Sequence, residues 1–157
     1  MIKTLVLGLD CAAPELLLET QQLENLRHLM QIGCHGPLQS IDPPITVPAW
    51  MCMATSQDPG SLGVYGFRNR ISHEYDSLRI VNSRSIRQLS LWDQVALEGG
   101  QASIVGVPPN YPPRRTSGVS VGCFLTPDPE QSVLTHPPEL SERIRQQCGS
   151  YAVAVPA

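Results

Sequence analysis

The stretch SLWDQVALEGGQASIVGV, residues 90–107, decides the fold class. Ser90, with Asp93 three residues later, resembles the capping box that marks a helix start. Apolar positions follow at Leu91, Val95 and Leu97. Gly99-Gly100 ends this helix, and residues 102–107 then read as a buried strand. A helix followed by a buried strand is half of a βαβ unit, so the stretch predicts an α/β fold.

Elements of both kinds are also predicted on either side of this unit. The apolar run at residues 2–9 predicts a first strand, buried on both faces of a parallel sheet. Helices are predicted from near Pro14, over residues 23–32 with a left-handed cap at Gly33, over 48–55 and over 139–148, and further strands over 119–124 and 151–155. We therefore expect a mostly parallel sheet with helices on both faces.

Length and composition restrict the function classes. A chain of 157 residues with 41% hydrophobic content can bury one core, and a net charge of -3 with scattered basic residues indicates neither nucleic acid nor a membrane as partner. The apolar run at residues 5–9 is too short for a signal sequence or a membrane span, so a cytoplasmic protein is expected. The five cysteines are odd in number and widely separated, which favours neither a disulfide framework nor a zinc knuckle.

Asp10 is the first candidate for chemistry, because it stands where the first predicted strand ends. Ligands and catalytic groups gather at the carboxyl edge of open α/β sheets. The alternative is that Asp10 caps the helix that starts near Pro14.

Thr46 is the second candidate and lies in the stretch PPITVPAW, residues 43–50. Its hydroxyl precedes a predicted helix N-terminus, where unpaired N–H groups and a partial positive charge could hold a phosphate while Thr46 attacks it. The alternative is an ordinary capping threonine.

Several short motifs follow one another in a fixed order. They are Gly8-Leu9-Asp10, Asn25-Leu26-x-x-Leu29 before Gly33, Pro44-x-Thr46-x-Pro48-Ala49-Trp50, Ala54-Thr55 and Asp58-Pro59-Gly60-x-x-Gly63. Their order and spacing resemble the type I phosphodiesterase/nucleotide pyrophosphatase branch of the alkaline phosphatase superfamily. The resemblance covers nearly the whole chain. It implies that residues 1–157 are the N-terminal part of a single alkaline phosphatase-like catalytic domain, incomplete at the C-terminus.

The resemblance also implies roles for both candidates. In that family two divalent metals, usually zinc, flank a threonine or serine nucleophile, and an aspartate after the first strand binds one of them. These roles map onto Thr46 as nucleophile and metal ligand, and onto Asp10 as metal ligand. The implied substrate is a small phosphate ester, either a phosphodiester or a nucleotide pyrophosphate.

The chain departs from the family pattern near its middle. Leu62-Gly63 stands where members often have His-Gly, and the phosphate-binding asparagine has no clear counterpart. Arg68, Asn69 and Arg70 are further candidates for substrate binding, with an exposed basic turn as the alternative.

The later metal ligands implied by the resemblance, an Asp-x-x-x-His, an Asp-His pair and a further histidine, do not occur in the chain. Its four histidines lack the spacing of a metal site. We therefore expect weak metal binding or none, no activity of the chain alone, and either self-association or association with a missing C-terminal segment. The alternative function is a noncatalytic α/β module that binds phosphate or a partner.

Overall fold

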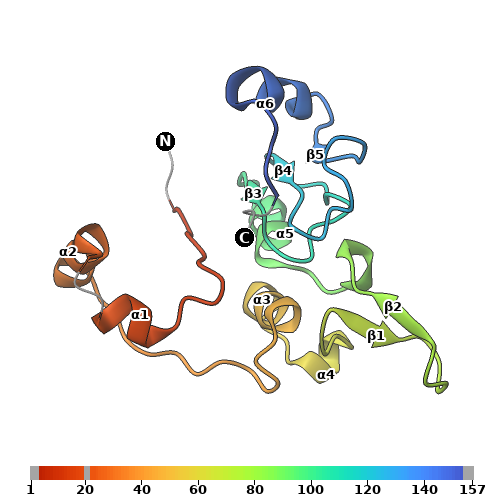
Figure 1. Cartoon of the computed structure of the whole chain (residues 1–157), viewed down its shortest axis with the longest axis horizontal. Coiled ribbons are helices and arrows are strands. Elements are labelled where there is room, and N and C mark those ends of the chain that lie inside the picture. Colours follow the sequence, from red (N-terminus) through yellow and green to blue (C-terminus); the bar gives the residue numbers. More distant parts are fainter. Residues whose placement is uncertain (1–3, 20–21, 154–157) are drawn as a thin grey trace. The chain divides into compact units, whose positions relative to one another are not determined.

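A computed structural model describes residues 4–19 and 22–153 of the chain (Figure 1). The chain divides into two compact units, Met1–Ser40 and Ile41–Ala157. Whether both belong to a single catalytic domain stays a prediction.

The first unit contains two helices, α1 at Pro14–Glu19 and α2 at Glu24–Ile32. Both confirm the sequence-based prediction, and Pro14 takes the first helical position, which suits its fixed φ. The left-handed cap predicted at Gly33 is wrong, because this residue has φ -121°. Its N–H donates to the Leu29 carbonyl at 2.9 Å, and an added Cβ would lie 3.0 Å from that same oxygen. A side chain at position 33 would therefore crowd the last turn of α2, and this crowding favours glycine there.

The strand predicted at residues 2–9 is not formed over its described part, residues 4–9. These residues are exposed, with Leu5 and Leu7 each 79% accessible. A strand requires a neighbouring strand that completes its hydrogen bonds. Within the described ranges, no strand pairs with this segment. Residues 2 and 3 lie outside the described part of the chain.

The second unit holds the remaining elements. In chain order they are α3 Thr46–Thr55, α4 Pro59–Leu62, β1 Arg68–Arg70, β2 Leu78–Ile80, the 3-10 helix η1 Ser83–Ser85, α5 Leu91–Leu97, β3 Ile104–Val105, β4 Ser120–Val121, β5 Thr135–His136 and α6 Leu140–Cys148. The predicted helices at 90–97 and 139–148 are thus confirmed. At the start of α5, Asp93 Oδ2 accepts from the Ser90 backbone N–H at 2.8 Å, as the capping box predicted.

The prediction of a mostly parallel sheet is wrong. β1 and β2 form an antiparallel hairpin, while β3 pairs parallel with β4 and β4 pairs antiparallel with β5. The α/β class holds, but the strands are short, and for β3 the reason is local. Gly106 at φ +69° turns the chain after β3, just before Pro108-Pro109, and prolines have no N–H for a ladder. The strand predicted at 151–155 is not formed at residues 151–153, and residues 154 and 155 lie outside the described part.

The core of the second unit packs α3 against α4 and α5. Val47 and Met51 of α3 are 0% and 2% exposed, and the same cluster includes Trp92 and Ile104. Burial of this helix face fixes the position of the α3 N-terminus, where Thr46 lies. Across the described ranges, no helix combines the length and apolar character needed to cross a membrane.

Candidate active site

Thr46 is the first residue of α3, and the residue in the N-cap position is Ile45, with φ -103° and ψ 140°. The helix begins two residues before the predicted start at Pro48. Pro48 can lie inside the first turn because the first N–H groups of a helix have no partner within the helix. Thr46 is therefore not the capping residue that the alternative reading predicted.

The start of α3 combines a half-buried hydroxyl with the positive end of a ten-residue helix. Gly66, two residues before β1, lies near the side chain of Ile45, since an added Cβ would be 3.9 Å from Ile45 Cδ1.

The three substrate-binding candidates form strand β1 rather than a turn. Asn69 donates from Nδ2 to the Gly63 carbonyl and accepts at Oδ1 from the Tyr65 N–H at 3.3 Å. Both ends of its amide therefore stabilise the connection between α4 and β1. Arg68 and Arg70 are exposed, and the Arg70 guanidinium lies 4.4 Å from the centre of the Tyr75 ring.

Asp10 lies in an exposed turn of the first unit. The hydrogen bond from Leu17 N to Ala13 O, 3.2 Å long, places Ala13 rather than Asp10 immediately before α1. Cys11, at φ +57°, donates its thiol hydrogen to Asp10 Oδ2 over 3.6 Å. The negative charge of Asp10 raises the pKa of the Cys11 thiol, and this hydrogen bond raises it further. Because Asp10 and Thr46 belong to different units, their juxtaposition stays a prediction.

The substitution Asp10→Asn is expected to speed alkylation of Cys11 by iodoacetamide at pH 8. The thiolate is the reactive form, and removing the neighbouring negative charge lowers the thiol pKa, so more thiolate is present at that pH. Peptide mass spectrometry would follow the rate, with exposed Cys34 and Cys148 as internal controls. A Cys11 rate that stays constant relative to these controls would contradict the described contact.

Among the residues that the structure describes, none form a metal centre complete in itself. Within the described ranges, no group of three His, Cys, Asp or Glu residues could hold a metal ion. Asp10 and Thr46 together supply one carboxylate and one hydroxyl, whereas catalytic zinc commonly has three protein ligands. His28, His35 and His73 are exposed, and His136 is half-buried in β5.

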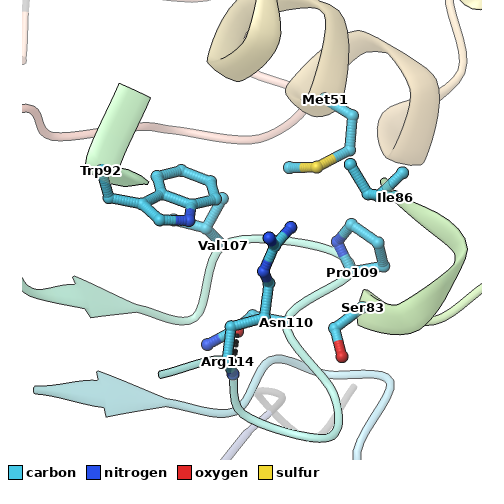
Figure 2. A pocket seen from close by; sticks show the side chains of 8 residues that line it. All are labelled: Met51, Ser83, Ile86, Trp92, Val107, Pro109, Asn110 and Arg114. Atoms are coloured by element: carbon cyan, nitrogen blue, oxygen red, sulfur yellow. Dashed lines mark hydrogen bonds between the residues drawn. The ribbon is translucent and has the colours of Figure 1, made fainter. Parts of the chain in front are cut away.

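A small pocket in the second unit was not predicted from the sequence. Figure 2 shows its lining side chains, among them Met51 of α3, Trp92 of α5 and Arg114. Trp92 and Arg114 are far apart in the sequence and form no known motif, so the sequence offers no signal for their convergence.

Comparison with protein families gives a match over most of the chain. The model of the family "Type I phosphodiesterase / nucleotide pyrophosphatase" matches residues 4–156, a range that includes Asp10, Thr46 and β1. Searches of curated proteins and of solved structures found no match.

Proposed function

Because the chain belongs to the type I phosphodiesterase/nucleotide pyrophosphatase family, we propose that it forms part of the active site of a phosphodiester or nucleotide pyrophosphate hydrolase, with Thr46 as nucleophile. The observation that supports this role is the position of Thr46 at the first residue of α3. A helix N-terminus directs N–H groups and a partial positive charge toward an anion, so it can hold phosphoryl oxygens beside the hydroxyl.

The proposed reaction has two steps. The Thr46 oxygen attacks phosphorus, the bond to the leaving group breaks, and the Thr46 proton ends on that leaving group. The phosphorus stays bonded to Thr46 as a phosphothreonine ester that keeps the other substituent of the substrate. Water then cleaves this ester and restores the hydroxyl. Arg68 and Arg70 are better candidates than Asn69 for binding the phosphate, because Asn69 is already hydrogen-bonded within its loop.

The same proposal makes Asp10 and Thr46 two ligands of a divalent metal pair, zinc by the family resemblance. Two ligands are fewer than catalytic zinc needs, so we propose that the chain alone is inactive and that another segment supplies further ligands. Exposed apolar residues support a role in association with such a segment or with a second copy, notably Leu5, Val6, Leu7 and Leu9. A cytoplasmic location belongs to the proposal as well, supported by five free cysteines.

Reconstitution tests this function. The chain would be mixed with a C-terminal segment that carries the Asp-x-x-x-His and Asp-His ligands, and we expect the mixture to retain zinc and to hydrolyse bis-p-nitrophenyl phosphate. A mixture that binds phosphate but neither retains zinc nor turns over substrate would instead support the noncatalytic binding module.

A further inference from the structure

The hairpin of β1 and β2 holds one of its two faces against the rest of the second unit. Phe67, directly before β1, packs its ring against Phe124, with 6.2 Å between the ring centres. Val81, directly after β2, is 2% exposed and belongs to the core. Asn69 lies on the same face as Phe67, because side chains alternate along a strand, and its amide donates to the Gly63 carbonyl. This inner face is therefore fixed by contacts with the unit.

The opposite face of the hairpin carries two arginines and two aliphatic side chains. In the antiparallel register Arg68 lies opposite Ile80 and Arg70 lies opposite Leu78, and residues directly opposite each other share a face. All four are exposed, Ile80 to 57% and Leu78 to 51%. Within the described ranges, neither arginine makes an ion pair with a carboxylate. These four residues form the outer hairpin face.

Positive charge is concentrated in and directly after this hairpin. Residues 68–87 contain five of the eleven basic residues of the chain and two of its fourteen acidic residues, so the stretch has a net charge of +3 in a chain whose net charge is -3. All five of these basic residues are exposed arginines. The two acidic residues, Glu74 and Asp76, lie in the loop that joins β1 to β2 and not on the outer hairpin face. This face therefore suits an anionic partner.

The aliphatic pair distinguishes between anionic partners. A nucleic acid backbone would neutralise the arginines but leave Leu78 and Ile80 in water. A second copy of the chain, related by a two-fold axis, would use the same surface and so bring the arginines of both copies together. An anionic phospholipid surface suits both kinds of side chain, because its headgroups attract arginines and its interfacial region takes up aliphatic groups.

We propose that the outer hairpin face binds peripherally to an anionic membrane surface. Arg68 and Arg70 contact lipid headgroups, while Leu78 and Ile80 enter the boundary between headgroups and acyl chains. The shape of the molecule permits this approach, since the hairpin extends away from the other elements of the second unit (Figure 1). Binding of this kind lies on the bilayer and requires no spanning helix.

Flotation of the full chain with lipid vesicles tests this proposal. We expect binding to phosphatidylcholine vesicles that contain phosphatidylserine, and little or none to vesicles of phosphatidylcholine alone. Added salt should release the bound protein, because ions screen the attraction between arginines and anionic lipids. Equal binding to the two kinds of vesicle, or binding to neither, would overturn the proposal.

Matched charge variants assign the binding to the outer hairpin face. The double variant Arg68→Gln/Arg70→Gln is expected to lower the partition coefficient into the phosphatidylserine vesicles roughly thirtyfold, because two arginines near the anionic surface are lost. Arg115→Gln/Arg143→Gln removes the same charge from exposed positions outside residues 68–87 and should bind nearly as the original chain does. An equal loss in both variants would show that total charge, and not this face, determines binding.

The aliphatic pair provides an independent check that keeps every charge. Leu78→Ser/Ile80→Ser is expected to weaken vesicle binding about tenfold, because less apolar surface leaves water. Unchanged binding, or equally tight binding of a single-stranded oligonucleotide by the original chain, would point to a general polyanion site and contradict the membrane proposal.

Vesicle binding is also separable from the proposed hydrolysis, although Arg68 and Arg70 are candidates for both. Thr46→Ala protein without zinc should bind the vesicles as the original chain does, so the two proposals can fail separately. If the reconstituted mixture lost vesicle binding, the C-terminal segment would be the partner that covers this face, and the membrane proposal would be wrong.

Discussion

The isolated chain is expected not to hydrolyse bis-p-nitrophenyl phosphate or a nucleotide pyrophosphate above background, with or without added zinc. An activated nucleophile in this chemistry needs a metal that lowers its proton affinity and neutralises charge on the phosphoryl oxygens. Asp10 and Thr46 supply too few ligands to hold that ion. Loss of metal stabilisation removes several kcal/mol from the transition state, and each ~1.4 kcal/mol is a tenfold loss in rate.

A contaminating phosphatase is the main confounder of that assay, so Thr46→Ala protein would be prepared in parallel. Equal background rates in the two preparations agree with an inactive chain. Zinc-dependent turnover that Thr46→Ala abolishes would show that the chain holds further metal ligands, and the claim of inactivity would be wrong.

In the reconstituted mixture, Thr46→Ala is expected to lower kcat by on the order of a thousandfold or more, because it removes the proposed attacking oxygen. Thr46→Ser keeps a hydroxyl at the same position and should retain measurable turnover. The comparison is of initial rates at saturating substrate. Both variants would be measured with the same preparation of the C-terminal segment.

Thr55→Ala is the matched control for that comparison. It removes a hydroxyl from the other end of α3, where Thr55 Oγ1 donates to the Met51 carbonyl at 2.6 Å. It should leave kcat close to that of the original chain at temperatures where the variant is folded. If Thr46→Ala and Thr55→Ala reduced kcat alike, the effect would come from the helix and not from a nucleophile.

Local signals in the sequence predicted the helices well. Each signal acts within a few residues: the capping pair Ser90 and Asp93 marks the start of α5, Pro14 lies in the first turn of α1, and Gly149 follows the end of α6. These helices could therefore be located without knowledge of the fold. The start of α3 was misplaced because a proline is tolerated anywhere in a first turn, and Pro48 is the third helical residue.

The sheet could not be predicted in the same way, because a strand depends on a partner distant in the sequence. β3 pairs with β4 in a register that joins Ile104 to Ser120. Residues 4–9 have a strand-like sequence but no such partner within the described ranges. The pocket at Trp92 and Arg114 was missed for a related reason, since only the packing of α5 against the 107–114 segment brings these side chains together.

An experimental structure of the chain with its complementing segment would give the distance between the Asp10 carboxylate and the Thr46 hydroxyl, and this distance decides whether the two residues belong to one site. The proposal predicts that their oxygens lie within ~6 Å of each other, the reach of two zinc–oxygen bonds with some side-chain freedom. Oxygens further apart than this would contradict the claim that Asp10 and Thr46 form one catalytic site.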